Sequence, residues 1–313
     1  MASALKKICL IDGNALLYQN YYGTLRSNLT NPKGIRINAV YGFLRKILGI
    51  INSEEYDGIS VLWDHPSPTF RHVKYPAYKG NRSTTPEDLV PQFNIARQAV
   101  EACQLKQIEM PSFEADDIIA TLSNKLSNEN IYVEILTGDK DLLQLVNPYV
   151  ICKRLQNGKI YNVATVVDEY GIYPEQIPEL FALIGDTVDN LPGIPGIGKV
   201  RGKQLLQEYK SIDDIINICK NNDISELENM KYGKLLASVQ NYITNDKNSS
   251  DPMSLEDAIE MNTLVQNINE IDNLNVDKII EDCKYPKLAQ NRDELKQVPL
   301  YDFLIEHDFK SML

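Results

Sequence analysis

Residues 8–14 of the chain read ICLIDGN, a short apolar run that ends in an acidic residue and a glycine. The same pattern recurs as ISVLWDH at residues 59–65 and as VEILTGD at residues 133–139. Apolar runs of this length, bounded by turn residues, predict buried β-strands. The strands are expected at Ile8–Ile11, Ile59–Trp63, Tyr132–Leu136 and Tyr149–Cys152.

Segments with helical periodicity lie between these runs. The helices are expected at Ala39–Ile51, Asp88–Cys103 and Ala115–Leu126. Strands that alternate with helices predict an α/β fold with a mostly parallel central sheet and flanking helices. After Pro174 the strand pattern disappears, and the chain reads as helices joined by Gly/Pro turns, with a polar loop at Asn245–Pro252 and a last helix at Leu300–Glu306. We therefore expect an α/β core at residues 1–180 and a helical part at residues 181–313.

Three of the predicted strands end in an aspartate or run into one. Asp12 closes the first and Asp64 the second, while Asp139 follows the third with Asp141 two residues later. The carboxyl ends of parallel strands meet at one edge of a sheet, where ligand sites gather. A single aspartate after a strand commonly caps the next helix or stabilises a turn. Several at the same edge indicate a functional site instead.

Two further segments are rich in carboxylates. FEADDII places Glu114, Asp116 and Asp117 at the start of a predicted helix, and IGDTVDN places Asp186 and Asp189 three residues apart. A solvated acidic first turn is the alternative reading of the first cluster, because the helix dipole favours acids there. Clustered carboxylates without His or Cys suit Mg²⁺ or Mn²⁺, and two such ions close together polarise a phosphate and activate a water. The candidate metal ligands are Asp12, Asp64, Glu114, Asp116, Asp117, Asp139, Asp141, Asp186 and Asp189.

The formal net charge of −11 argues at first against a nucleic-acid partner, because phosphates attract cations. However, residues 65–86 and 190–207 contain Lys and Arg and no carboxylate, so the chain carries two basic islands. In the first island, FRHVKYPAYKGNR (70–82), cations alternate with tyrosines. This mixture suits a single-stranded path in which rings stack on bases and cations follow phosphates, and it makes Arg71 and Tyr78 candidate DNA contacts. The alternative is an ordinary solvated basic loop.

The second island, LPGIPGIGKVRGKQLL (191–206), places three glycines in a tight turn before an amphipathic helix. The spacing of a nucleotide-binding P-loop is met, but Val200 stands where Ser or Thr would bind magnesium, and no strand precedes the turn. A hairpin between two helices that presents backbone N–H groups to a phosphate fits better. The candidate DNA-binding residues here are Gly193, Gly196, Gly198, Lys199, Arg201 and Lys203.

The five cysteines are widely spaced and form no C-x-x-C pair, which favours reduced thiols in a cytoplasmic protein and argues against a zinc site. No apolar run is long enough to cross a membrane, and residues 1–11 predict a strand after a short tail, not a signal peptide.

Together these motifs resemble the 5′-nuclease (flap endonuclease) family, which includes the 5′→3′ exonuclease domain of bacterial DNA polymerase I and small phage flap endonucleases. The matching segments follow the family order, while residues 211–273 match poorly. They are LIDGNALLY (10–18), AVYGFLRKI (39–47), LWDHPSPTFRHVKYPAYKGNR (62–82), FEADDIIATL (113–122), TGDKDLLQLV (137–146), LIGDTVDNLPGIPGIGKVRGKQLL (183–206) and, more weakly, YDFLIEHDFKSML (301–313).

The resemblance implies a PIN-like nuclease core with a helical arch at about residues 66–98. It also implies a helix–hairpin–helix element at Gly193–Lys203 that grips duplex DNA and holds a K⁺ ion. The nine carboxylates would bind two or more Mg²⁺ ions, with Mn²⁺ able to substitute. Lys79 and Arg82 would touch the scissile phosphate, and Tyr18 would stack on a terminal base.

We therefore expect a Mg²⁺-dependent, structure-specific 5′-nuclease, both 5′→3′ exonuclease and flap endonuclease, that acts on DNA with 5′ flaps, free 5′ ends or branches in replication or repair. It would leave a 5′-phosphate and a 3′-hydroxyl and work as a stand-alone monomer. Two alternatives come from other classes: a branched-DNA-binding protein without activity, and a single-strand ribonuclease of related fold. The complete set of carboxylates argues against the first, and the glycine hairpin argues against the second.

Overall fold

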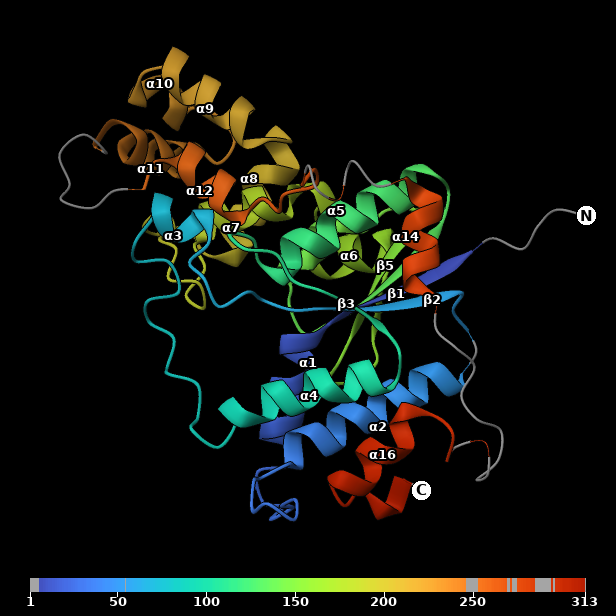
Figure 1. Cartoon of the computed structure of the whole chain (residues 1–313). Coiled ribbons are helices and arrows are strands. Elements are labelled where there is room, and N and C mark those ends of the chain that lie inside the picture. Colours follow the sequence, from blue (N-terminus) through green and yellow to red (C-terminus); the bar gives the residue numbers. More distant parts are fainter. Residues whose placement is uncertain are drawn as a thin grey trace, which may run out of the picture.

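A computed structural model describes residues 6–53, 55–245, 253–268, 271, 275–284, 294 and 296–312 of the chain (Figure 1). None of the described helices is long and apolar enough to cross a membrane. All five cysteines are buried and free.

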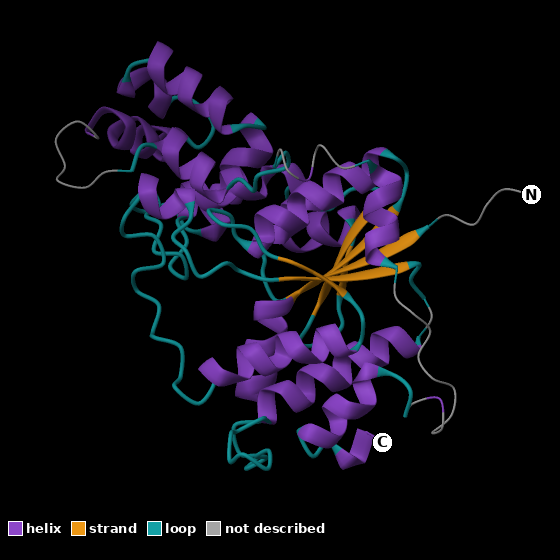
Figure 2. Ribbon diagram, viewed as in Figure 1, coloured by secondary structure: helices purple, strands orange, loops and turns teal. Residues whose placement is uncertain are grey.

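The centre of the molecule is a six-stranded sheet with the strand order β3-β2-β1-β4-β5-β6 (Figure 2). The first five strands in this order are parallel, and β6 pairs antiparallel with β5. The four predicted strands are confirmed, within two residues at each end. They are β1 (Lys7–Asp12), β2 (Gly58–Leu62), β4 (Tyr132–Thr137) and β5 (Val150–Arg154). The sheet also contains β3 (Lys106–Ile108) and β6 (Ile160–Tyr161), which are too short for the sequence pattern to show them.

Both faces of the sheet are covered by helices, as expected for a parallel sheet. Ile8 and Leu10 of β1 face one hydrophobic core, and Cys9 and Ile11 face the other, in the alternation of a strand buried on both sides. The second core holds helices that Figure 1 shows on one face of the sheet. They are α1 (Gly13–Gly23), α2 (Asn38–Asn52), α4 (Val90–Ala102) and α16 (Pro299–Glu306).

The opposite face carries α5 (Ala115–Asn128), α6 (Val163–Tyr170) and α14 (Val276–Cys283). The helices predicted at Ala39–Ile51, Asp88–Cys103, Ala115–Leu126 and Leu300–Glu306 are thus confirmed as α2, α4, α5 and α16.

The predicted helical part follows the sheet, and its apolar side chains belong to the same continuous core as those of α5. Its helices are α7 (Ile177–Ile184), α8 (Lys199–Tyr209), α9 (Ile212–Asn221), α10 (Ile224–Glu228), α11 (Gly233–Asn245) and α12 (Leu255–Asn262). The loop predicted at Asn245–Pro252 lies, from residue 246 onward, outside the described residues. The domain boundary at residue 180 stays a prediction. Beyond the helical part, α14 contacts β2 and α16 contacts α4, so the chain returns to the core.

The predicted arch, at residues 66–98, connects the two faces of the sheet. It begins with the short helix α3 (Phe70–Lys74), which lies beside the helical part, and it ends in α4 on the opposite face (Figure 1). The connection between them, residues 75–89, consists of turns and extended backbone. This segment therefore passes the edge of the sheet at which β1, β2 and β4 end.

Candidate active site

Asp12 lies at the carboxyl end of β1, between the two neighbouring parallel strands β2 and β4. It is the N-cap of α1: its Oδ1 accepts a hydrogen bond from the N–H of Ala15 (2.9 Å). Its Oδ2 accepts a bond from the hydroxyl of Thr137 at the end of β4 (3.0 Å). Burial raises the pKa of Asp12 to about 7, and the carboxylates of Asp64 and Asp139 add to the rise.

Asp64 and Asp116 complete a first set of carboxylates around Asp12 and Asp139. Asp64 Oδ1 accepts a bond from the N–H of Ala115 at the start of α5 (2.9 Å), which fixes the end of β2 against that helix. Burial raises the pKa of Asp116 well above its usual value, and the charges of Asp139, Asp12 and Asp64 raise it further. The strand ends and the first turn of α5 therefore bring together four carboxylates, which we call the central carboxylates: Asp12, Asp64, Asp116 and Asp139.

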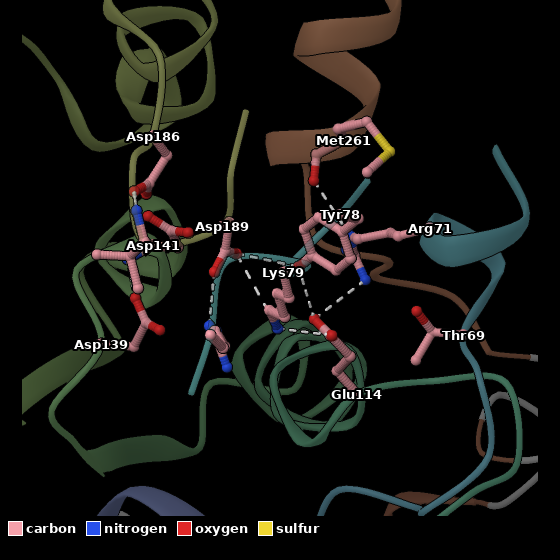
Figure 3. Close-up of polar contacts among 12 residues, drawn as sticks. Thr69, Arg71, Tyr78, Lys79, Glu114, Asp139, Asp141, Asp186, Asp189 and Met261 are labelled. Atoms are coloured by element: carbon pink, nitrogen blue, oxygen red, sulfur yellow. Dashed lines mark hydrogen bonds and ion pairs between the residues drawn. The ribbon is translucent and has the colours of Figure 1, made fainter. Parts of the chain in front are cut away.

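A second set lines an open pocket of about 550 Å³ beside the first. These pocket carboxylates are Asp139, Asp141, Asp186 and Asp189. Burial raises the pKa of Asp141 well above its usual value, with further contributions from Asp139, Asp186 and Asp189. Figure 3 shows Asp139, Asp141 and Asp186 on one side of the site and Glu114 on the other, with Asp189 between them.

Three cations lie among these carboxylates. Lys79 Nζ is 2.6 Å from Glu114 Oε1 and 4.0 Å from Asp189 Oδ2. Arg82 Nη2 is 2.5 Å from Asp189 Oδ1, and Lys140 Nζ is 3.0 Å from Asp186 Oδ2. In the described part of the chain, no group of three Asp, Glu, His or Cys side chains is already arranged to hold a metal ion. These ion pairs reduce the repulsion at Glu114, Asp186 and Asp189, and no ion pair is found for the central carboxylates in the described residues.

The residues present nevertheless fit a divalent cation. Asp141 Oδ1 is buried and has no hydrogen-bond partner, which is costly for a carboxylate oxygen. The raised pKa values of Asp12, Asp116 and Asp141 have the same origin, buried negative charge that is incompletely balanced. Oxygen ligands of this kind suit hard ions such as Mg²⁺ and Mn²⁺. The best candidate ligands are the central and pocket carboxylates.

Three of the predicted site residues lie in buried contacts, and their roles as metal ligand or DNA contact stay predictions. Asp117 is a candidate metal ligand in the sequence, but both its oxygens are bonded to Arg71 (2.7 and 2.8 Å) and accept further bonds from backbone N–H groups. Arg71 has 1% of its surface exposed. Tyr78 is 3% exposed, and its hydroxyl is bonded to Glu114 and Asp189.

Glu114 lies with these buried residues at the start of α5. Its Oε2 accepts from the hydroxyl of Tyr78 (3.1 Å) and lies 3.6 Å from Arg71 Nη1, while Oε1 faces Lys79. Burial alone would lower the pKa of Lys79, but the carboxylates of Glu114 and Asp189 raise it. This lysine therefore carries its positive charge. Lys79 and Arg82 therefore lie at the carboxylates, and their contact with the scissile phosphate stays a prediction.

Tyr18 is half-buried on α1, where its hydroxyl shares a hydrogen bond with Thr85 of the arch (2.8 Å). Its ring packs edge-on against Phe93 at the start of α4 and is stacked near Tyr22. Contact with a terminal base stays a prediction for this residue.

The glycine hairpin lies between α7 and α8, in agreement with the predicted helix–hairpin–helix order. A side chain at Gly193 would meet the backbone of Ile184 at 2.2 Å, and Gly196 has a left-handed φ of 82°, so both glycines are required by the turn itself. Gly198 is the N-cap of α8.

The hairpin cations lie on α8. Lys199 and Arg201 are exposed, whereas Lys203 is half-buried and donates to the carbonyl of Glu169. The first turn of α8 contains no acid, although the helix dipole favours negative charge there. Cations and free N–H groups at one helix start suit a bound anion. Phosphate binding and the K⁺ ion at the hairpin stay predictions.

Two family models match adjoining parts of the chain, which together cover residues 7–291. The model described as the 5′-3′ exonuclease, N-terminal resolvase-like domain, matches residues 7–171, and the 5′-3′ exonuclease, C-terminal SAM fold, matches residues 172–291. The chain belongs to the 5′-3′ exonuclease family.

Curated relatives of this 5′-3′ exonuclease family member include a 5′-3′ exonuclease of Aquifex aeolicus, which is 34% identical over 212 residues, or 68% of this chain and 73% of that protein. The thermostable DNA polymerase I of Thermus thermophilus is 36% identical over 225 residues, which cover 72% of this chain and 26% of the polymerase. The chain thus spans about a quarter of the length of the polymerase that it matches.

Among solved structures, a flap endonuclease of bacteriophage T5, solved as a complex with DNA and metal ions, has a TM-score of 0.62 at 20% sequence identity. The similarity covers 97% of this chain and 100% of the phage protein. At this identity the likeness concerns the fold, and it confirms the predicted α/β core with its helical part.

Several site residues had no signal in the sequence. Thr137 connects the carboxylate of Asp12 to the backbone of Asp139, because its hydroxyl donates to Asp12 and accepts from the N–H of Asp139 (2.9 Å). Asn81 and Asn190 bond backbone carbonyls across the site. All three residues are uncharged, whereas the motifs are defined by charged residues. Only their positions near Asp139, Arg82 and Asp189 in the sequence could have indicated that they belong to the site.

Proposed function

We propose that the chain is a divalent-metal-dependent 5′-nuclease that hydrolyses DNA phosphodiesters at 5′ flaps and free 5′ ends. The observation that carries the proposal is the group of carboxylates at the ends of β1, β2 and β4 and at the start of α5, where desolvation and mutual repulsion raise the pKa of Asp12, Asp64 and Asp116. Lys79 and Arg82 lie at the edge of this group. Membership of the 5′-3′ exonuclease family supports it. The T5 flap endonuclease of the same fold, which binds DNA and metal ions, points in the same direction.

The central and pocket carboxylates would hold the ions, for which Mg²⁺ is the expected species. Ions bound there would supply charge stabilisation of the phosphate and a water activated at neutral pH. Thr137 orients Asp12 and Asp139, and Ala115 orients Asp64. These contacts fix the carboxylates before any substrate arrives, which is the arrangement that catalysis requires.

Lys79 and Arg82 would bind the phosphate that reacts. In the structure both form ion pairs with carboxylates, which hold them at the edge of the site. A phosphate and its ions would compete for these contacts and draw the two side chains onto the substrate. The exposed cations of α8 would hold the duplex backbone some distance away without reading its sequence.

The test is cleavage of an end-labelled 5′-flap duplex by the purified protein, with Mg²⁺ or with EDTA. We expect a short labelled product with Mg²⁺ and none with EDTA. Parallel arms with an RNA-primed flap and with single-stranded RNA determine substrate preference and test the ribonuclease alternative. Binding without cleavage in every arm would instead support a branched-DNA-binding protein.

Asp168→Asn, on an exposed face of α6, is a suitable active control for carboxylate variants.

A further inference from the structure

Two short segments, more than a hundred residues apart in the chain, are bonded to each other beside the carboxylates. The N–H of Lys79 donates to the carbonyl of Asp189 (2.9 Å). The amide of Asn81 donates to the carbonyl of Thr187 (2.6 Å), and the amide of Asn190 donates to the carbonyl of Ala77 (2.7 Å). We call these three hydrogen bonds the arch clasp, because they fasten the start of the arch to the loop after α7.

The arch clasp joins two residues with unusual backbone conformations. Lys79 has a φ of 55° and Asn190 a φ of 58°, both in the left-handed region. Asn tolerates this region, but Lys has no local reason to adopt it. Strain of this kind persists only where the surroundings enforce it, and it gathers at functional sites. Two hydrogen bonds hold this conformation. The N–H of Lys79 donates to Asp189, and the amide of Asn190 donates to Ala77, which lies two residues before Lys79.

The backbone conformation decides where the side chain of Lys79 lies. Figure 3 shows its amino group between Glu114 and Asp189, and the N–H of Arg82 bonds the carbonyl of Lys79 (3.0 Å). A lysine has many rotamers, so aiming it at one point costs entropy unless its backbone is already fixed. The arch clasp thus fixes the base from which Lys79 and Arg82 reach the carboxylates.

We propose that Asn190 and Asn81 are positioning residues, which hold Lys79 in its left-handed conformation so that its amino group stays at the reacting phosphate. The inference rests on the proposed function for its kinetic part. Both amides bond backbone carbonyls, and on this proposal both act through Lys79. If these contacts only stabilised the loop, their loss would lower the stability of the protein, and the effect would not depend on Lys79.

Asn190→Gly is the sharpest variant, because glycine adopts a positive φ freely while the amide that bonds Ala77 is lost. Asn81→Ala removes the bond to Thr187 from an exposed side chain. Asn130→Gly is the matched control: Asn130 also has a φ of 58° but lies in the exposed turn after α5.

The first measurement does not depend on activity. Hydrogen exchange in the metal-free protein should become faster in peptides that cover residues 77–82 and 187–190 in Asn190→Gly and Asn81→Ala, because the amide of Lys79 loses its support. The rest of the chain and the melting temperature should match the wild type, as should every peptide of Asn130→Gly outside its own turn. Unchanged exchange in both segments would overturn the arch clasp.

The second measurement is single-turnover cleavage of a 5′-flap with saturating enzyme. Misplacement of a catalytic group by about 1 Å slows a reaction by up to about a hundredfold, so Asn190→Gly should slow cleavage about ten- to a hundredfold. Its DNA affinity in Ca²⁺ should stay within about twofold of wild type.

In a Lys79→Ala background, Asn190→Gly should slow cleavage further by less than about twofold, because its effect passes through Lys79. Equal slowing in both backgrounds would refute the positioning role. If the wild type cleaves nothing, the proposed function fails, and hydrogen exchange alone decides the arch clasp.

Discussion

Arg71 and Asp117 meet side-on through two hydrogen bonds, Nη1 to Oδ2 at 2.7 Å and Nη2 to Oδ1 at 2.8 Å. Their exposed fractions are 1% and 0%. The guanidinium also donates to the carbonyls of Met261 and Thr263 at the end of α12, as Figure 3 shows for Met261. This pair therefore joins α3 and the first turn of α5 to the helical part. It connects the base of the arch to the helix that Glu114 caps and that carries Asp116.

Arg71→Ala should lower the free energy of unfolding by about 3–5 kcal/mol, because it leaves the buried charge of Asp117 without its partner. Arg71→Lys should lose less, since the charge remains while the two-pronged geometry is lost. Urea unfolding measures both. Arg45→Ala on the exposed face of α2 serves as the control and should change stability by less than about 0.5 kcal/mol. A stability of Arg71→Ala equal to that of the control would contradict the structural role.

The sequence predicts the strand-end aspartates well because each of them directly follows the apolar run that reveals its strand. A parallel strand buried on both faces is a continuous apolar run, and Asp12, Asp64 and Asp139 follow such runs. The sequence does not show that Arg71 and Tyr78 are buried, because the residues that cover them lie far away in the chain. Alternating cations and tyrosines resemble an exposed nucleic-acid path, and nothing in residues 70–82 shows that α12, some 190 residues later, covers Arg71. The strand β3 escapes prediction since its three residues are only partly buried.

Asp141→Asn should slow cleavage at least about a hundredfold, because changes even to groups that merely support a metal ligand cost ten- to a hundredfold. The same variant should raise the melting temperature in EDTA, since a buried charge without a partner is removed. Cleavage of a 5′-flap in Mg²⁺ and thermal unfolding in EDTA test the two effects separately. Asp168→Asn should leave both unchanged. Normal cleavage by Asp141→Asn would remove this residue from the metal site.

The cations of α8 should govern how DNA affinity depends on salt. Replacing Lys199, Arg201 and Lys203 by Ala should make the slope of log affinity against log salt less steep by about 2–3, since each phosphate contact contributes about 0.9. Affinity for duplex should fall, while short single strands should bind almost as before. Titrations at several salt concentrations provide the slope. Arg45 and Lys46, exposed on α2, make a control pair whose replacement should leave the slope unaltered. An unchanged slope in the triple variant would exclude α8 as the duplex contact.

Glu179 makes stability depend on pH. Burial raises its pKa from 4.5 to about 7, with contributions from Asp213 and Asp214, and its Oε2 is buried without a hydrogen-bond partner. The folded protein thus holds this proton more tightly than the unfolded chain does. Stability from this group is complete below pH 4.5 and is lost as the pH rises through about 7.

Glu179→Gln should therefore be more stable than wild type at pH 8 and should lose less stability between pH 5 and pH 8. Urea unfolding at the two pH values measures the difference. Glu101→Gln, an exposed glutamate of α4, should follow the wild-type pH dependence. If Glu179→Gln has the same pH dependence as well, the buried carboxyl does not titrate in this range.

Replacing Lys79 separates an effect on the cleavage rate from an effect on DNA affinity. Lys74, a second lysine of the same basic island, is a suitable comparison because its contacts are structural. Lys74 forms ion pairs with Asp257 and Glu260 of α12. Lys79, in contrast, is charged and held between Glu114 and Asp189 at the edge of the carboxylates. A surface ion pair contributes little to stability, so Lys74→Ala should behave almost as wild type in cleavage.

Negative charge grows on the phosphate as water attacks it, so a cation at that point stabilises the transition state more than the bound substrate. Loss of one such contact costs about 2.7–4 kcal/mol, or roughly a hundred- to a thousandfold in rate. We therefore expect single-turnover cleavage of a 5′-flap by saturating Lys79→Ala to be slower by that factor, with DNA affinity in Ca²⁺ within a few-fold of wild type, because the cations of α8 still hold the duplex. The opposite pattern, weaker binding with an unchanged rate at saturation, would make Lys79 a binding residue. A rate within a few-fold of Lys74→Ala would show that its ammonium group serves only to neutralise Glu114.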